Sequence, residues 1–258
     1  MSVQRERRLV FGEDAAGYDD ARPSYPAALV DHLVGLVGAT ARVIDVGTGT
    51  AKGTQLLAER GMTGVGVEAD PAMAAVAECH LAPYPGWRVD VSDFEWWRPA
   101  DGDAPADLVT SAQAWHWVQP QVGLWCAHRL LRPGGRLAVW WNLADADDRP
   151  VRREIDAVYD EIAPGQPFCP TVGRDEGTPF DRAPDGVTFA DVEHRLFDWR
   201  HRYSTGELLA LLRTHSNHKV MDPDQLDRLM DAVAGVVDRD GGTFDYPYVT
   251  QLWSARHP

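Results

Sequence analysis

In the first half of the chain, short apolar runs alternate with longer amphipathic stretches. The apolar runs predict β-strands at 42–46, 63–68, 87–91, 107–112 and 135–142. The amphipathic stretches predict helices at 26–37, 52–60, 71–80 and 119–131. Strands that alternate with helices in this way are typical of a parallel sheet joined by crossover helices. The pattern therefore predicts an α/β fold.

The pattern changes after residue 142. Residues 145–200 are rich in acids, proline and glycine, with one predicted helix near 148–162. A strand at 192–203, helices at 204–213 and 222–237, and a last strand at 244–255 follow. The segment after the fifth strand indicates an insertion or lid, although an exposed loop explains 164–185 equally well. We expect one domain, divided into an N-terminal cap (1–40), a binding core (41–143), an insertion or lid (144–200), and C-terminal helices with a last strand (201–258).

Composition narrows the class of protein. With 258 residues, 44% hydrophobic and 25% charged, the chain has the composition of a globular protein. It contains no apolar run near the roughly 20 residues of a membrane span and no secretory signal, so we expect a cytoplasmic protein, monomeric or homodimeric. The net charge of −14 argues against a nucleic-acid partner. The three cysteines lack metal-ligand spacing, so no metal site is expected.

The first predicted strand leads into a glycine-rich turn. The turn reads Asp45-Val46-Gly47-Thr48-Gly49-Thr50-Ala51-Lys52, and the next strand ends at Glu68. Glycines between a strand and a helix let a ligand approach the backbone closely, and an acid ending the next strand can hold both hydroxyls of a ribose. The sequence therefore predicts a cofactor that contains a nucleoside, although a tight turn without a ligand remains an alternative.

The spacing within this turn selects the cofactor. A dinucleotide fingerprint requires its third glycine where this chain has Lys52, whereas the small residue Ala51 lies one position earlier. The pattern Asp-x-Gly-x-Gly-x-Ala resembles the first motif of class I methyltransferases that use S-adenosyl-L-methionine (SAM). Asp45 would suit the cationic end of SAM and would repel a pyrophosphate. A nicotinamide-dependent oxidoreductase is the weaker alternative.

Further motifs extend the resemblance. They lie at 65–73, 89–93, 106–117 and 130–135, and Phe11-Gly12, Tyr18 and 22–26 precede them. Together they resemble the UbiE-like and trans-aconitate-methyltransferase-like branch of small-molecule methyltransferases (methyltransferase type 11), over residues 9–142, at 211–216 and in the last strand. The resemblance implies a Rossmann-like, seven-stranded sheet with helices on both faces. It also implies methyl transfer from SAM to a small molecule, with S-adenosyl-L-homocysteine (SAH) as the product.

The resemblance assigns residues to the cofactor. Glu68 would accept hydrogen bonds from the ribose, Asp90 would bind the adenine amino group, and Arg22 would bind the carboxylate. Pairing of Arg22 with Asp19 or Asp20 is an alternative for that side chain. The residues expected to bind SAM are Tyr18, Arg22, Tyr25, Asp45, Gly47, Thr48, Gly49, Glu68, Ala69, Met73, Asp90, Val91, Ser111 and Ala112.

The acceptor is less well defined. His116 follows the fourth strand and is the candidate catalytic base, because imidazole titrates near neutrality. It could instead bind the cofactor or fix the loop. Trp115, Trp117 and Trp141 could wall an apolar or aromatic acceptor pocket or be ordinary core residues, and His215 is a weaker candidate. Carbon, oxygen and nitrogen acceptors are all compatible with this fold. A protein that binds SAM or SAH without methylating, as a regulator or cyclisation catalyst, is the other class of function.

Overall fold

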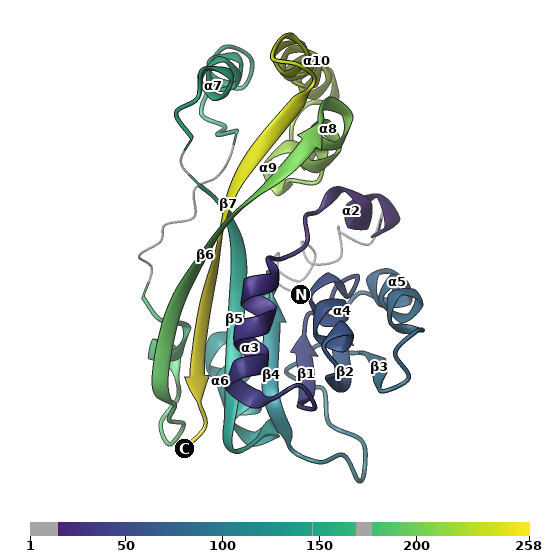
Figure 1. Ribbon diagram of the computed structural model, residues 1–258, viewed down its shortest axis with the longest axis vertical. Coiled ribbons are helices and arrows are strands. Elements are labelled where there is room, and N and C mark those ends of the chain that lie inside the picture. The colour runs from purple at the N-terminus through teal and green to yellow at the C-terminus, as the bar shows by residue number, and fades with distance from the viewer. Residues whose placement is uncertain (1–14, 146, 169–176) are drawn as a thin grey trace.

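The computed structural model describes residues 15–145, 147–168 and 177–258, and its centre is one seven-stranded sheet (Figure 1). The strand order is β3-β2-β1-β4-β5-β7-β6, with β7 antiparallel to both of its neighbours. The strands are β1 (Arg42–Val46), β2 (Thr63–Glu68), β3 (Trp87–Val91), β4 (Ala106–Ala112), β5 (Leu131–Ala144), β6 (Ala190–Ser204) and β7 (Thr243–Arg256). The order reverses between β1 and β4, where open α/β sheets bind their ligands.

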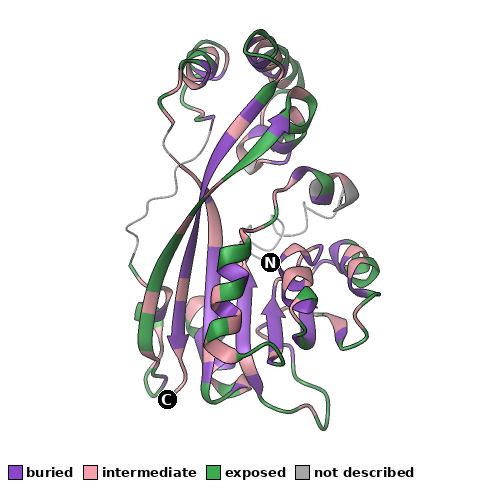
Figure 2. Cartoon of the chain, viewed as in Figure 1, coloured by how far each residue is buried: buried purple, intermediate pink, exposed green. Residues whose placement is uncertain are grey.

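Helices cover both faces of the parallel part of the sheet, as predicted. On one face, α3, α4 and α5 pack on Val43, Leu108 and Trp140, and on the other face α6 packs on Ile44 and Val109. These helices are α3 (Ala27–Val37), α4 (Lys52–Glu59), α5 (Pro71–Leu81) and α6 (Pro120–Leu130). Figure 2 shows the central strands buried along most of their length, in contrast to the exposed edge strand β6.

The three C-terminal strands of the sheet are longer than predicted. Strand β5 spans 14 residues and β6 spans 15, because β7 pairs with both of them well beyond the parallel strands. The β5–β7 ladder continues to the pair Ala144 and Tyr248. The strands β1 to β4, the paired part of β5 and the helices α3 to α6 are here called the parallel core. The extensions carry the sheet away from this core and provide a surface for a second group of helices.

That second group, here called the distal cluster, consists of α7 to α10 and the adjoining ends of β6 and β7. Its helices are α7 (Pro150–Ile162), α8 (Thr205–Arg213), α9 (Ser216–Lys219) and α10 (Pro223–Arg239). They enclose a separate apolar core that includes Tyr159, Phe168, Leu208, Val233 and Phe244. Helix α7, expected within an insertion or lid, thus shares a core with the C-terminal helices.

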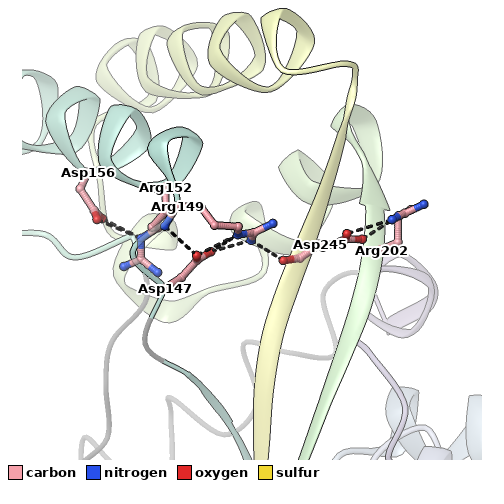
Figure 3. Close-up of polar contacts among 6 residues, drawn as sticks. All are labelled: Asp147, Arg149, Arg152, Asp156, Arg202 and Asp245. Atoms are coloured by element: carbon pink, nitrogen blue, oxygen red, sulfur yellow. Dashed lines mark hydrogen bonds and ion pairs between the residues drawn. The ribbon is translucent and has the colours of Figure 1, made fainter.

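A chain of ion pairs borders the distal cluster (Figure 3). The Arg149 guanidinium binds Asp147 and donates a hydrogen bond of 2.5 Å to the Asp245 carbonyl oxygen. Arg202 of β6 binds the Asp245 carboxylate through two nitrogens, at 2.6 and 2.9 Å. The Arg149 guanidinium also lies 5.0 Å above the Phe244 ring. These contacts attach the start of α7 to β7 and β7 to β6.

The N-terminal part of the described chain joins the two regions. Helix α2 (Ala15–Ala21) packs against α8 of the distal cluster and against α5 of the parallel core. Asp19 of α2 lies 3.5 Å from the Lys52 ammonium and 3.6 Å from the His80 ring. Lys52, the residue that departs from the dinucleotide fingerprint, therefore holds α2 against the core.

Candidate active site

A cavity of about 450 Å³ lies at the carboxyl ends of β1, β2 and β4 and extends to the distal cluster. Its parallel-core wall includes Gly47, Thr48, Gly49, Glu68, Ala69, Met73 and Ala112. Its distal wall includes Leu211, His215, Asn217, Tyr246 and Tyr248, while Arg22 and Tyr25 line it from the N-terminal segment. The volume is in the range of small-molecule sites.

The glycine-rich turn forms the floor of this cavity. Gly47 and Gly49 have φ angles of 66° and 59°, in the left-handed region that glycine adopts without strain. A Cβ on Gly47 would lie 2.4 Å from the Ala114 Cβ. A side chain at Gly47 would therefore clash with the protein itself, whether or not a ligand is bound. A Cβ on Gly49 would meet only Met73, at 3.7 Å. Gly47 is thus required by the fold, and Gly49 keeps the floor open.

Glu68 is held at the edge of the cavity by the backbone. Its carboxylate accepts hydrogen bonds from the Gly49 amide at 2.8 Å and the Asp70 amide at 2.9 Å. Burial raises the Glu68 pKa, and these two amides oppose the rise. Each oxygen retains acceptor capacity, because a carboxylate has about four lone-pair sites. The geometry suits the predicted ribose contact.

Asp45 does not line the cavity, in contrast to its predicted place beside the cationic end of SAM. Its carboxylate is buried and accepts hydrogen bonds from the hydroxyls of Thr48 at 3.0 Å, Thr54 at 2.5 Å and Thr110 at 2.7 Å. Burial raises the Asp45 pKa, and these three hydroxyls oppose the rise. Asp45 therefore fixes the turn to α4 and β4 from beneath.

The acid predicted to bind adenine also points elsewhere. Asp90 accepts a hydrogen bond of 2.9 Å from the Trp97 indole and pairs with Arg88, and Val91 is exposed. Neither lines the cavity. On this side the described lining residues are Ser92, Phe94 and Glu95, in the loop that follows β3.

Two more predicted residues have structural contacts instead of a place in the cavity wall. The Ser111 hydroxyl donates a hydrogen bond of 2.8 Å to the Val46 carbonyl, which joins β4 to β1. Trp115 is buried against Phe94 in the core beneath the loop. Of the three tryptophans predicted to wall the acceptor, Trp117 alone lines the cavity.

His116 lines the cavity, and the third of those tryptophans supports it. The Trp141 indole nitrogen lies 3.3 Å from the Nδ1 atom of His116. An indole N–H can only donate, so Nδ1 is the acceptor. His116 is exposed toward the cavity, but partial desolvation by its surroundings lowers the His116 pKa and favours the neutral ring. A neutral imidazole that accepts at Nδ1 carries its proton on Nε2, which gives this nitrogen the role of a hydrogen-bond donor.

The N-terminal candidates lie at the junction of the two regions. Arg22 donates a hydrogen bond of 3.1 Å to the Thr214 carbonyl, at the end of α8. Tyr25 packs edge-on against Trp140, with 5.8 Å between ring centroids. Tyr18 lies in α2, but its side chain is outside the described part, as are Phe11 and Gly12.

Several lining residues were not predicted. Asn217, Tyr246 and Tyr248 belong to the distal wall, and Gln113 and Asn142 lie at the ends of β4 and β5. Gln113 has a φ angle of 58°, which is uncommon outside glycine and typical of functional loops. The alternation of Phe244, Tyr246 and Tyr248 on one face of a strand was the available signal for the aromatic wall.

Within the described ranges, no helix combines the length and apolar character that crossing a membrane requires. The same residues contain no group of three or more side chains suited to hold a metal ion.

Comparisons with known proteins identify the family. The methyltransferase domain family matches residues 44–139. An uncharacterized methyltransferase of Mycobacterium tuberculosis is 32% identical over 255 residues, which cover 96% of this chain and 95% of the relative. A trans-aconitate 2-methyltransferase of Delftia acidovorans is 38% identical over 120 residues, or 44% of this chain and 42% of the relative.

Solved structures share the fold. A proposed type II methyltransferase from Anaeromyxobacter dehalogenans superposes with a TM-score of 0.64 at 20% identity, covering 92% of this chain and 98% of that one. The geranyl diphosphate C-methyltransferase of Streptomyces coelicolor, solved with SAH, gives 0.51 at 15% identity over 100% and 99% of the two chains.

The chain belongs to the methyltransferase family, and it is a SAM-dependent methyltransferase with the class I fold. The residues present fit this cofactor. Glu68 offers a carboxylate to a diol, and the open floor at Gly49 lies beside the apolar Met73. A nicotinamide-dependent oxidoreductase is not supported.

Proposed function

We propose that the protein transfers the methyl group of SAM to a small molecule bound between the parallel core and the distal cluster. The observation that carries this proposal is one continuous cavity, with Glu68 and the glycine-rich turn on one side and His215, Tyr246 and Tyr248 on the other. The cofactor supplies an electrophilic methyl group on a sulfonium centre. The protein's contribution is to align the acceptor and exclude water.

We assign the cofactor to the parallel-core wall. Glu68 would accept hydrogen bonds from the ribose hydroxyls, and the backbone from Gly47 to Gly49 would lie against the cofactor. Met73 would pack on the adenine, and Ala69 and Ala112 would complete the wall. Arg22, Tyr25 and Tyr18 would close over the cofactor from the N-terminal segment, as expected from the resemblance. All of these except Tyr18, whose side chain is not described, line the cavity.

We assign His116 as a residue that touches the cofactor or acceptor and donates a hydrogen bond from Nε2. A general base needs a free lone pair facing the proton that it removes. The lone pair of Nδ1 is directed at Trp141, and Nε2 carries the proton. This geometry supports positioning over proton abstraction, the two roles between which the sequence could not decide.

Nitrogen NMR of the His116 ring tests this assignment without any acceptor. We expect the Nε2–H tautomer at pH 7, and Trp141→Phe should shift the ring toward a mixture of tautomers, since the indole donor is lost. Trp253→Phe is the matched control, because Trp253 stacks on a different histidine, His194. An Nδ1–H tautomer in the parent protein would restore base catalysis as the better assignment.

The other class of function is a protein that binds SAM or SAH without methylating. The cofactor wall alone does not separate the two, since binding and turnover use the same residues. Thermal unfolding with and without SAH tests binding, and transfer of a radiolabelled methyl group to a panel of carbon, oxygen and nitrogen acceptors tests turnover. Binding without transfer to any of the panel would favour a regulator or cyclisation catalyst.

A further inference from the structure

The two walls of the cavity differ in charge. Three carboxylates line it, those of Glu68, Asp70 and Glu95, and all belong to the parallel-core side, where the lining cation Lys52 is paired with Asp19. The described lining residues of the distal wall carry no carboxylate. Arg22 reaches this wall and is bonded to the Thr214 carbonyl. A cationic cofactor is therefore favoured at one wall, and an electron-rich ligand at the other.

His215 is held on the distal wall by its neighbour His218. The Nδ1 atom of His218 lies 2.6 Å from the Leu212 carbonyl, which can only accept, so Nδ1 carries the proton. The Nε2 atom of His218 then accepts from the Tyr159 hydroxyl at 3.0 Å. The His215 ring stacks on this fixed ring at 5.7 Å, with 12° between their planes.

The polar atoms of His215 are placed unequally. Nδ1 is buried and makes no hydrogen bond within the described structure, and the ring lines the cavity. Burial, the charge of Arg22 and the neighbouring His218 lower the His215 pKa to about 3, so the ring is neutral at pH 7. An N–H at Nδ1 would have no acceptor, so a ligand that accepts a hydrogen bond from Nε2 would hold the proton on that nitrogen. Asn217 adds a second polar side chain to the same wall.

Next to this donor lies an aromatic surface. Tyr246 and Tyr248 both line the cavity, with their rings stacked 4.5 Å apart at 20°. Trp199 stacks on the other side of Tyr248 at 4.8 Å, and the Tyr248 hydroxyl pairs with that of Tyr203. The stack is thus fixed. Both faces of the Tyr248 ring are covered and both tyrosines are largely buried, so a flat ligand would meet the ring edges, a contact geometry that aromatic rings favour.

We propose that the distal wall is the acceptor subsite and that it recognises an aromatic carboxylate, with the ring against Tyr246 and Tyr248 and the carboxylate bound by His215 near Arg22. This inference rests on the proposed function and names its substrate class. The carboxylate is an anchor in this arrangement. The opposite side of the ring faces His116 and the cofactor wall, where the methyl group would be received.

Fluorine NMR with 4-fluorobenzoate as the probe tests the subsite on the full-length protein saturated with SAH. We expect 4-fluorobenzoate to bind at least tenfold more tightly than 4-fluorobenzylamine or 4-fluorotoluene. His215→Phe keeps a flat ring over His218 but removes the donor, and should weaken 4-fluorobenzoate binding at least tenfold. Tyr246→Leu should weaken 4-fluorobenzoate and 4-fluorotoluene together. His201→Phe, at an exposed site outside the cavity, is the matched control and should change neither.

The outcomes separate this inference from the proposed function. Equal affinity for the carboxylate, the amine and the toluene, or no binding of any of them, would overturn the subsite. A His215→Phe variant that loses SAH affinity as strongly as 4-fluorobenzoate affinity would assign the wall to the cofactor's own carboxylate and also overturn it. The titration is repeated without SAH. Failure of the parent protein to bind SAH would then count against the proposed function alone, while the 4-fluorobenzoate comparison still decides the subsite.

Discussion

The parallel core and the distal cluster face each other across one cavity, but they are assembled differently. In the core, each functional turn follows a strand directly, and consecutive strands β1 and β2 lie side by side. The distal cluster brings α7 together with α10, and Tyr159 together with His218, over long stretches of chain. The proposed cofactor wall is therefore a local product of the sequence, and the proposed acceptor wall is a product of tertiary packing.

This difference teaches where specificity can change. A wall made of backbone turns and one strand-end acid is constrained by the fold, as Gly47 shows through its contact with Ala114. A wall made of side chains on helices and an extended strand can be altered with little effect on the turn that holds the cofactor. The same scaffold can thus keep one cofactor while its acceptors vary.

The largest expected effect comes from a substitution in the distal core. It should destabilise the protein while leaving cofactor binding nearly unchanged. Phe168 is fully buried there and packs on Tyr159 and Phe244. Phe168→Ala should lower the free energy of unfolding by about 3–5 kcal/mol. SAH affinity, measured by calorimetry at a temperature where the variant is folded, should stay within about threefold.

Trp140→Ala is the counterpart in the parallel core. It should cost a similar free energy, and it should also weaken SAH binding, because Trp140 supports Tyr25 and Gly53 at the cavity. If Phe168→Ala reduced SAH affinity as strongly as Trp140→Ala, the two regions would not be separable.

The next effect is a pH dependence that belongs to the distal wall. The folded state lowers the His215 pKa from 6.5 to about 3, so the unfolded chain binds a proton that the folded chain does not bind between these values. Stability is thus fully present above pH 6.5 and falls as the pH decreases, by at most about 1.4 kcal/mol per pH unit. Water in the cavity will reduce this slope.

Urea unfolding at pH 7, 6 and 5 measures this dependence. The His215→Phe variant should lose less stability than the parent on going from pH 7 to pH 5, whereas His201→Phe should follow the parent. Parallel curves for the parent and His215→Phe would mean that His215 does not supply the pH dependence.

The sequence was sufficient for the core because its signals are local. The strand ranges 42–46, 63–68 and 87–91 match β1, β2 and β3 at both ends, and the acid at Glu68 lies at the cavity as expected. Asp45 and Asp90 were less predictable. Their motif positions are local, but the direction of each carboxylate depends on Thr110 and Trp97, which come from other parts of the chain.

The distal wall was harder to predict from the sequence, because its residues come from separate parts of the chain. Its strands and the helices α7, α8 and α10 were predicted with ends within a few residues, whereas the short helix α9 was not predicted. Nothing in a single sequence places Asn217 and Tyr246 in one cavity. Of the three tryptophans expected to wall the acceptor, Trp117 lines the cavity, whereas Trp115 is buried in the core and Trp141 binds His116. Tyr246 and Tyr248 add aromatic lining that was not expected.

A substitution at Glu68 tests the parallel-core wall separately from the distal wall. Glu68→Ala removes the carboxylate that accepts from the Gly49 amide at the cavity, at a cost of about 1.5–3 kcal/mol per charge-assisted bond to the cofactor. SAH affinity by calorimetry should fall at least tenfold, while binding of 4-fluorobenzoate should change little. Glu78→Ala, at an exposed position on α5, is the control. An unchanged SAH affinity in Glu68→Ala would remove the ribose assignment.

The smallest effect concerns the ion pairs at the border of the distal cluster. Arg149 joins Asp147, the Asp245 carbonyl and the Phe244 ring, whereas Arg202 makes an exposed pair with Asp245. Arg149→Met should lower the free energy of unfolding by about 1–2 kcal/mol, because a partly buried carboxylate loses its partner. Arg202→Met should cost less than about 1 kcal/mol, as exposed pairs do. Urea unfolding at low and high salt distinguishes the two ion pairs, since salt screening weakens the attraction within the exposed pair more than within the partly buried one. Equal costs at both salt concentrations would show that burial at Asp147 does not strengthen its pair.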